Sequence, residues 1–495
     1  MTEMIRKRPL KAAVLFSLFL LPLLLIFNGK GEQAMTIRDT DIRLKISWKK
    51  EDEFNPLYTQ RFGADPGVME YNGRLYVYTT NDLVEKDADG NVLENSYRLI
   101  RTINCISSDD LVNWTDHGAI PVAGGIAKWA VNSWAPCAAH KVVDGAEKFF
   151  LYFCNGGNGI GVLTADSPVG PWRDELGRLL IDRSVPTCAD VTWLFDPAVM
   201  VDEDGTGYLA FGGGVPQGRD ADPGTGRIVR LGADMISLDG DPVRLEVPYL
   251  FEDSGINRIG NRYIYSYCSN WNTRGNSLGI TDGAIEYMTA DSPLGPYTYA
   301  GELFPNQGRF FGLYGNNHHA IACLDGQYYL FYHNRSVEKA RGLTGNYRSP
   351  QIDRITVGED GALARVRGTM RGVEQLKPLN PYETVSALTM SHQAGTYFDT
   401  LEDRPVLHAL AGGWIRVTSV DFSAGCRAFT LRACSPEGCT VYVVTGDVHG
   451  EIAAAVSVPA GDAPAAYTVP LNLAGVQDVF LVFSDKCLAE SWSVD

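Results

Sequence analysis

The chain has 495 residues, about three times the ~150 residues typical of one domain, so we expect two or three folding units unless one fold is large. Apolar residues make up 45% and charged residues 21%, which excludes a disordered, a collagen-like or a polytopic membrane protein. The formal net charge is −16, because 59 acidic residues outnumber 43 basic ones. This charge argues against a nucleic-acid partner, whose phosphates would be repelled, and suits a neutral substrate.

Residues 1–34 predict an N-terminal signal peptide or signal anchor. Four cations between Arg6 and Lys11 precede an uncharged run of sixteen residues, 12–27. That run is short for a membrane span of ~20 residues and long for the apolar region of a signal peptide, about 7–15 residues. A buried core helix is disfavoured at a terminus directly behind four cations. We therefore expect an exported protein, secreted or membrane-anchored through this segment only, with the rest of the chain outside the cytoplasm.

The ten cysteines are scattered, without a C-x-x-C pair or a metal-ligand spacing. Cys154 and Cys268 end aromatic strands, where a thiol is most simply a small core side chain. Cys434 and Cys439 are close enough to pair across a turn. Although exported proteins often contain disulfides, we expect no more than one or two here.

A repeated pattern predicts the fold. Each copy has a polar start, an apolar stretch, a turn that contains Gly, and an alternating aromatic strand, so each copy reads as a β-hairpin. The five copies are ADPGVMEYNGRLYVYTT (64–80), WAPCAAHKVVDGAEKFFLYFC (134–154), FDPAVMVDEDGTGYLAFGG (195–213), FEDSGINRIGNRYIYSYC (251–268) and NNHHAIACLDGQYYLFYHN (316–334).

A second element follows several hairpins, as in SSDDLVNWTDHG (107–118) and TADSPLGPYTYAG (289–301), and adds two more short strands. Four strands repeated every 55–75 residues predict an all-β protein with a five-bladed β-propeller over residues 50–375. The alternative, one large β-sandwich, would not explain five copies of one motif in one order.

The spacing within the hairpins places charged residues together. The eighth residue before the turn glycine is Asp65, Glu252 or His318 in three hairpins, and the ninth is Asp196 in another. We expect these four residues at equivalent positions on the innermost strands, where they would converge on the central channel. Asp65 and Asp196 each precede a proline, which favours extended geometry. The alternative is a coincidental ring of solvated charges.

Carboxylates that converge on a channel suit the hydrolysis of an acetal. One protonated carboxyl protonates the departing sugar oxygen, one carboxylate activates water, and a third raises the pKa of the acid by repulsion. Trp134 and Phe195 could stack on a sugar ring, or equally pack in the core. A serine triad lacks the G-x-S-x-G motif, and metal-dependent hydrolysis would need a denser histidine cluster than the one around His318.

The starts ADP, FDP and FED, the WAP of the second hairpin and NNHH followed by YYLFYHNRS resemble glycoside hydrolase family 43 over about residues 55–375. The resemblance implies an inverting mechanism with Asp65 as general base, Asp196 as pKa modulator and Glu252 as general acid. It also implies that His318 is the channel histidine, which in many members binds a central Ca²⁺ directly or through water.

The same resemblance implies the substrate site. Arg335, in YHNRS, matches an arginine near the substrate, and Trp134, Phe195 and His318 complete the expected substrate-binding set. Phe195 departs from the pattern, because a smaller aliphatic residue is expected before the aspartate, and this departure is expected to change the pocket's shape.

The composition changes after about Gln375, where KPLNP (377–381) reads as a linker before a run of short strands. Residues 376–495 resemble a family 6 carbohydrate-binding module, a β-sandwich of jelly-roll type. Trp414 and Trp492 are candidates for sugar stacking or, equally, for core packing. The opening SALTMSH lacks the acidic pair expected in that module's first strand.

Several functions stay open at this point. The first is an exo-acting glycosidase that releases arabinose, xylose or both from plant cell-wall polysaccharide such as arabinoxylan. The others are an endo-arabinanase on the same scaffold and a non-catalytic glycan-binding propeller, which would be expected to lack a carboxylate. A retaining fructan-processing enzyme would have its two carboxylates ~5 Å apart instead of ~6.5–9.5 Å.

Overall fold

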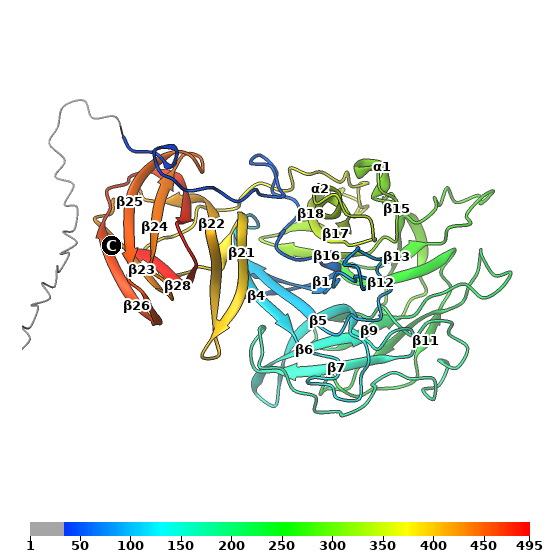
Figure 1. Cartoon of the computed structure of the whole chain (residues 1–495). Helices are drawn as coiled ribbons and strands as arrows, with labels where there is room; N and C mark the ends of the chain where they lie inside the picture. Colours follow the sequence, from blue (N-terminus) through cyan, green and yellow to red (C-terminus); the bar gives the residue numbers. More distant parts are fainter. Residues whose placement is uncertain (1–33) are drawn as a thin grey trace, which may run out of the picture. The chain divides into compact units, whose positions relative to one another are not determined.

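Five antiparallel sheets follow one another along residues 64–355 of the computed structural model, which describes residues 34–495 (Figure 1). The export segment predicted over residues 1–34 lies outside the described residues, apart from its last position. Within the described part of the chain, no helix is long and apolar enough to cross a membrane.

The five sheets are the blades of a propeller. Their strands are β1 (Ala64–Tyr71), β2 (Arg74–Thr80), β3 (Ile103–Ser108) and β4 (Trp114–Ile120) in blade 1; β5 (Trp134–Val143), β6 (Ala146–Cys154) and β7 (Ile160–Ala165) in blade 2; β8 (Ala198–Val201), β9 (Gly207–Phe211), β10 (Gly226–Arg230) and β11 (Val243–Leu245) in blade 3; β12 (Leu250–Ile259), β13 (Arg262–Ser269), β14 (Ile285–Ala290) and β15 (Thr298–Phe304) in blade 4; and β16 (His319–Leu324), β17 (Gln327–Asn334) and β18 (Ser349–Ile355) in blade 5.

The innermost strand of each blade contacts those of the neighbouring blades. β1 lies beside β5, β5 beside β8, β8 beside β12, β12 beside β16, and β16 beside β1, so the ring closes. The predicted five-bladed propeller is confirmed. The hairpin turns follow from the sequence: Asn72 and Gly73 have φ of 52° and 71°, and Asp325 and Gly326 have φ of 51° and 76°, as two-residue hairpin turns require.

Blades 2 and 5 have three strands each, whereas the repeat predicted four. After β7 the chain adds no fourth strand to the blade and makes isolated bridges to β7 instead, between Thr164 and Arg173 and between Ile160 and Ile181. Pro171 lies beside the first bridge and has no N–H to donate to a strand ladder. In blade 5 the outer edge of β18 is covered by the segment before β1: the side chain of Asn55 accepts a hydrogen bond from the Ile352 N–H (2.9 Å) and donates to the Ile352 carbonyl (2.8 Å).

Apolar side chains fill the spaces between neighbouring blades. Met69 and Tyr78 of blade 1 pack with Phe149 and Leu151 of blade 2 in one buried cluster. Three helical segments occur in the described part of the chain, and all are short: the 3₁₀ helix η1 (Ile37–Asp39), α1 (Gly308–Phe311) and α2 (Ser336–Ala340). The propeller is therefore held together by sheet-to-sheet packing.

A β-sandwich domain follows the propeller, as predicted. Its strands are β19 (Val385–Ser386), β21 (His392–Leu401), β22 (Arg404–Asp421), β23 (Ala428–Ser435), β24 (Cys439–Thr445), β25 (Glu451–Val458), β26 (Gly461–Pro470), β27 (Val476–Phe483) and β28 (Cys487–Val494). The short strand β20 (Thr389–Met390) instead pairs with β4, so it adds a fifth strand to blade 1.

The sandwich tryptophans belong to its interior. Trp492 is 1% exposed and stacks on Phe429, and Trp414 is 7% exposed and packs on Phe480. Both tryptophans therefore pack in the core, which was the alternative to sugar stacking, and neither presents a ring face to a sugar. All ten cysteines lie in the described part of the chain and are free, so the pairing considered for Cys434 and Cys439 is not formed.

Candidate active site

A cavity of about 410 Å³ opens at the start of the innermost strands. Six of the seven residues predicted for the site line it: Asp65, Trp134, Phe195, Asp196, Glu252 and His318. Arg335 does not: its Nε contacts Glu338 (2.5 Å), and its guanidinium lies near the Tyr314 carbonyl. The structure thus brings together the three predicted carboxylates, the histidine and both aromatic residues, but not the predicted arginine.

A left-handed residue at the start of the inner strand recurs in four blades. Asp65, Ala135, Asp196 and Asp253 have φ of 50°, 40°, 49° and 67°, and bulges interrupt the pairing of the strands beside Asp65, Ala135 and Asp253. Non-glycine residues in this conformation are uncommon and gather at functional sites. The counterpart of Asp65 and Asp196 in blade 4 is therefore Asp253, and Glu252 lies one residue earlier.

This corrects the predicted equivalence of Glu252 with the two aspartates. Gly73 is the second residue of its two-residue turn, whereas Gly260 is the first of its turn, so counting back from the glycine shifts blade 4 by one position. Glu252 instead corresponds to Trp134 and Phe195, and all three line the cavity. Its carboxyl thus enters the site from a position that aromatic residues occupy in blades 2 and 3.

Asp65 is held as a carboxylate. Thr80 Oγ1 donates to its Oδ2 (2.7 Å), and Arg348 Nη1 donates to its Oδ1 (2.8 Å). Burial by itself would raise the pKa of Asp65, but the attraction of Arg348, His318 and His333 outweighs it and lowers the pKa to about 2. Asp65 is therefore ionised at neutral pH and can accept a proton from water.

Glu252 is held as a carboxylic acid. Its Oε1 is buried without a hydrogen-bond partner among the described residues. Burial, followed by repulsion from Asp196 and Asp65, raises its pKa well above 4.5. Burial and repulsion from Asp65 also raise the pKa of Asp196 to about 7, but the Asp253 N–H donates to Asp196 Oδ2 (2.9 Å) and favours its ionised form. The shared proton therefore belongs on Glu252.

His318 lies among three aspartates. Its Nε2 is 3.1 Å from Asp253 Oδ1, and its Nδ1 is 3.6 Å from Asp65 Oδ1 and 3.9 Å from Asp196 Oδ2. Asp253 is fully buried, and its Oδ2 is 2.5 Å from His319 Nδ1. Asp253 thus supports both the histidine, through its side chain, and the Asp196 carboxylate, through its backbone.

The calcium predicted on His318 stays a prediction. Calcium prefers oxygen ligands, and both ring nitrogens of His318 already face carboxylates. Within residues 34–495, no group of three or more His, Cys, Asp or Glu side chains is arranged to hold a metal ion. The side chains as they lie do not fit direct calcium ligation by His318, so the chemistry below is derived from the protein groups alone.

Aromatic side chains form the walls of the cavity. Trp193 packs edge-on against both Phe195 and Phe251, with ring centroids 5.3 Å apart in each pair. On the other side, Tyr97 lies edge-on to Trp134 at 6.2 Å. The cavity therefore has aromatic walls beside its carboxyl groups, a combination of apolar and polar lining that is typical of small-molecule sites.

Sequence reasoning missed Arg348, which lines the cavity in place of Arg335. Arg348 binds Asp82 through two nitrogens (2.9 and 2.8 Å) and lies 5.1 Å from the centroid of the Tyr97 ring. Sequence reasoning also missed Asp253, although the FED motif contains this second carboxyl directly after Glu252. Arg348 carried no comparable signal, because its partners are far away in the sequence.

Comparisons with known proteins agree with this geometry. Glycosyl hydrolases family 43 matches residues 54–363. The chain is 44% identical to an arabinoxylan arabinofuranohydrolase of Paenibacillus polymyxa, over 87% of this chain and 72% of that protein. It is 41% identical to an arabinoxylan arabinofuranohydrolase of Bacillus subtilis, over 94% of this chain and 95% of that protein. A crystal structure of a family 43 arabinoxylan arabinofuranohydrolase from Bacillus subtilis, in complex with cellotetraose, superposes with a TM-score of 0.88 at 39% identity, over 91% of this chain and 99% of that chain.

Proposed function

Because the chain belongs to family 43 of the glycosyl hydrolases, we propose that it is an inverting, exo-acting glycosidase that releases arabinose, xylose or both from plant cell-wall polysaccharide such as arabinoxylan. One observation carries the proposal: a single cavity holds an ionised carboxylate, Asp65, and a protonated carboxyl, Glu252. These are the base and the acid that glycoside hydrolysis needs.

The reaction follows from these two protonation states. Glu252 donates its proton to the departing glycosidic oxygen, while Asp65 accepts a proton from the water that attacks the opposite face of the sugar. Asp196 keeps the pKa of Glu252 high by repulsion, and Arg348 keeps Asp65 ionised. His318 is held by Asp253, and its Nδ1 lies 3.6 Å from Asp65 and 3.9 Å from Asp196, so it places a hydrogen-bonding group beside these two aspartates.

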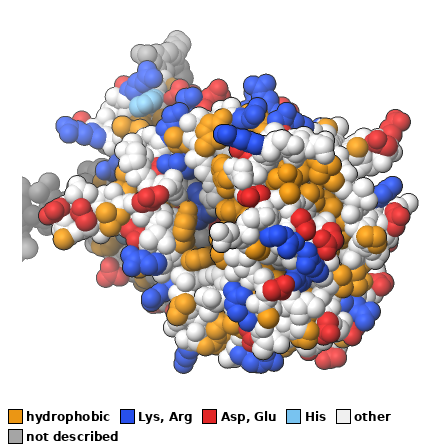
Figure 2. Space-filling model, turned by 90° about the vertical axis from the view of Figure 1, so that its right-hand side faces the viewer, with side chains coloured by type: hydrophobic (Ala, Val, Ile, Leu, Met, Phe, Trp, Pro, Cys, Tyr) orange, Lys and Arg blue, Asp and Glu red, His pale blue; other side chains and the backbone are white. Residues whose placement is uncertain are grey.

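The substrate class is supported by the relatives and by the charge of the molecule. Two relatives that match most of this chain are arabinoxylan arabinofuranohydrolases, so an arabinose side chain on xylan is the favoured substrate. On the face shown in Figure 2, Lys and Arg side chains lie among Asp and Glu side chains instead of forming one extended basic surface. Such a surface suits a neutral polysaccharide and not a nucleic acid.

The test compares hydrolysis of an aryl arabinofuranoside and an aryl xyloside by the wild-type protein and the Asp65→Asn variant. We expect the wild-type protein to turn over at least one of them, and the variant to lose at least ~10²-fold in kcat. Proton NMR during hydrolysis should show the inverted anomer first. Turnover of neither glycoside, or retention of configuration, would refute the proposal.

The endo-acting alternative differs in its products. On soluble arabinoxylan we expect free pentose to appear while the viscosity of the solution falls little. Linear arabinan tests the endo-arabinanase alternative, because a rapid fall in its viscosity with oligosaccharide products would indicate cleavage within the arabinan chain.

We also propose that the protein is exported, since four cations precede the apolar run at residues 12–27. Fractionation of the producing cells, followed by N-terminal sequencing, distinguishes a cleaved, secreted protein from an anchored one. A full-length protein in the cytoplasm would contradict the proposal.

The sequence of the C-terminal sandwich resembles a family 6 carbohydrate-binding module. We infer that it does not bind sugar on Trp414 or Trp492, because both rings are buried. Glycan binding outside the catalytic cavity would need another surface.

A further inference from the structure

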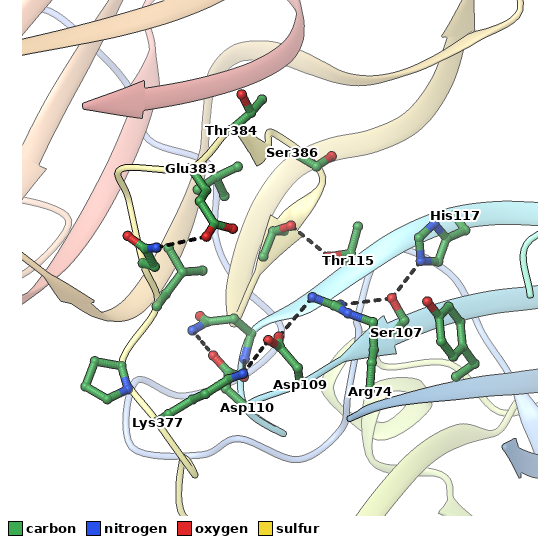
Figure 3. Close-up of a pocket in the computed structure, with 17 residues that line it drawn as sticks. Arg74, Ser107, Asp109, Asp110, Thr115, His117, Lys377, Glu383, Thr384 and Ser386 are labelled. Carbon is green, nitrogen blue, oxygen red and sulfur yellow. Dashed lines mark hydrogen bonds and ion pairs between the residues drawn. The ribbon is translucent and has the colours of Figure 1, made fainter. Parts of the chain in front are cut away.

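A second, larger cavity of about 530 Å³ lies between the outer strands of blade 1 and the segment that enters the sandwich (Figure 3). We call it the junction groove. One wall carries Arg74, Asp109 and His117 of blade 1, and the other carries Lys377, Glu383 and Thr384. Figure 3 shows Glu383 and Thr384 on one side and Arg74 and His117 on the other, while Lys377 reaches Asp109 of blade 1.

We propose that the junction groove is a second glycan-binding site, which takes a neutral segment of the polysaccharide whose side chains the catalytic cavity hydrolyses. The proposal rests on the proposed function for the identity of the polysaccharide. The volume of the junction groove lies within the ~300–1,000 Å³ typical of ligand sites, and none of the catalytic residues lines the groove.

The charges in the groove favour a neutral ligand. Asp109 pairs with both cations: its Oδ1 is 2.9 Å from Arg74 Nη2, and its Oδ2 is 2.8 Å from Lys377 Nζ. The carboxylate of Asp110 is taken by Asn113 (2.7 Å) and Gln375 (3.0 Å). Among the described residues that line the groove, no cation is left over to bind an anion, and the net charge of −16 repels one.

The remaining polar groups suit sugar hydroxyls. Among the described residues, no side-chain hydrogen bond involves the Thr384 hydroxyl or the Tyr76 hydroxyl, and the Glu383 carboxylate accepts only a long bond from Asn380 (3.3 Å). A polyhydroxylated ligand can donate to Glu383 and both donate to and accept from Thr384. An apolar ligand would instead leave these groups without partners.

The groove also has an aromatic face. The rings of Tyr76 and His117 are stacked, with centroids 6.3 Å apart and an angle of 25° between their planes. His117 Nε2 is 2.8 Å from Ser107 Oγ, which in turn accepts a bond from Arg74 Nη1 (3.1 Å), so the ring is held in place. A fixed aromatic surface beside free hydroxyls is the combination that sugar rings use in binding sites.

The position of the groove explains how it would act. It is built on β2, β3 and β4, whereas Asp65 lies on β1. Arg74 pairs with Tyr71, at the opposite end of β1 from Asp65. Six residues along a strand at ~3.3 Å each, combined with one to three strand spacings of ~4.8 Å, place the two sites about 20–25 Å apart. One polymer chain, or two neighbouring chains, can occupy both sites. The second contact raises the local concentration of substrate at the catalytic cavity. A single aryl glycoside is too small to reach both sites.

The test uses exposed residues of the linker wall, so that folding is preserved. The variants are Glu383→Ala combined with Thr384→Ala, and Thr384→Trp, which fills the groove. The matched control is Glu437→Ala, an exposed glutamate of the sandwich outside the groove. Each variant is also made in the Asp65→Asn background, where the polymer is not consumed.

Binding is measured as retardation in native gels that contain soluble arabinoxylan. In the Asp65→Asn background we expect both groove variants to lose at least ~3-fold in apparent affinity, while Glu437→Ala retains it. With Asp65 intact, the groove variants should raise KM for arabinoxylan and leave kcat/KM for the aryl glycoside unchanged.

The results separate the two proposals. Groove variants that are retarded like Glu437→Ala, with unchanged KM for arabinoxylan, would overturn the groove proposal and leave the catalytic proposal intact. Failure of the wild-type protein to hydrolyse any aryl glycoside would refute the catalytic proposal, and retardation lost in the groove variants would then still support the groove as a glycan site.

Discussion

The residues of the catalytic cavity are set to opposite protonation states by their surroundings. Asp65 is surrounded by positive charge and hydrogen-bond donors, so its pKa falls to about 2 although it is buried. Glu252 is buried beside other carboxylates, and one of its oxygens has no hydrogen-bond partner among residues 34–495, so its pKa rises. Two buried carboxyls thus divide into a base and an acid because their neighbours differ.

Replacing Arg348 is expected to move the acidic limb of the pH–activity profile. Without the guanidinium, burial dominates and the pKa of Asp65 rises from about 2, so Arg348→Gln should lose kcat/KM at a higher pH than the wild-type protein. Arg348→Lys keeps the charge and should keep most of the acidic limb. Equal profiles for Arg348→Gln and Arg348→Lys would show that Arg348 does not act on the base through its charge.

Replacing Asp196 is expected to move the basic limb. After burial, repulsion from Asp196 is the largest cause of the raised pKa of Glu252, so Asp196→Asn should let Glu252 ionise at lower pH. Activity should fall at neutral pH and recover in part on acidification. The control is Asp204→Asn, an exposed aspartate in the same blade. A profile that only scales down, with its basic limb unmoved, would mean that Asp196 mainly binds the sugar.

Calcium removal tests His318 as a metal ligand. Because both of its ring nitrogens face carboxylates, we expect dialysis against EGTA to change kcat on an aryl glycoside by less than ~2-fold. Readdition of Ca²⁺ serves as the control. A loss of activity that Ca²⁺ restores would establish the metal predicted from the family resemblance and would require His318 to turn away from Asp253.

At the scale of elements, hydrogen bonds and the short strand β20 connect blade 1 to the sandwich. Asn113, in the turn between β3 and β4, accepts from the Thr418 N–H (2.8 Å) and donates to the Thr418 carbonyl (2.9 Å). β20 adds to the edge of β4, and Thr115 Oγ1 lies 2.8 Å from Thr389 Oγ1. These contacts bury the edge of blade 1, which would otherwise be free to pair with another chain.

Asn113→Ala is therefore expected to destabilise the protein. It leaves the Thr418 N–H buried without a partner, which costs about 1–3 kcal/mol. The thermal midpoint of unfolding of Asn113→Ala should fall below that of the wild-type protein. Asn91→Ala, at an exposed turn, should change the midpoint little. Activity on an aryl glycoside at 25 °C should stay unchanged. A midpoint equal to that of Asn91→Ala would show that this junction adds no stability.

At the scale of the whole molecule, the ring closes without a strand shared between the first and last blades. The segment before β1 instead runs along β18: Leu57 N–H donates to the Pro350 carbonyl (2.9 Å), and the fully buried side chain of Asn55 bonds Ile352 and the Thr369 carbonyl (2.8 Å). The start of the propeller domain is thereby attached to its end.

Asn55→Ala is expected to weaken this closure. Three hydrogen bonds are lost, and the Ile352 N–H is left unpaired, so we expect a loss of stability larger than that of Asn113→Ala. Hydrogen exchange should increase mainly in β18. Unchanged exchange in β18 would show that other contacts close the ring.

The sequence by itself determined the features that depend on neighbours in the chain. Alternating strands and turns such as Asn72-Gly73 predicted five hairpins, and their order predicted the propeller. The same spacing placed Asp65, Asp196 and Glu252 on the inner strands, and the structure brings all three into one cavity. These predictions succeeded because hairpin geometry is decided within about ten residues.

Only the tertiary structure decided which distant groups surround those carboxyls. Arg348 lies 283 positions from Asp65 in the sequence, and His319 lies 66 positions from Asp253, so no local sequence pattern predicts either contact. The register of blade 4 also needed the structure, because Gly260 takes the first place in its turn and moves Asp253 to the position of Asp65. The protonation states follow from these long-range contacts, since a carboxyl's pKa depends on the charges and donors that folding brings within a few ångströms.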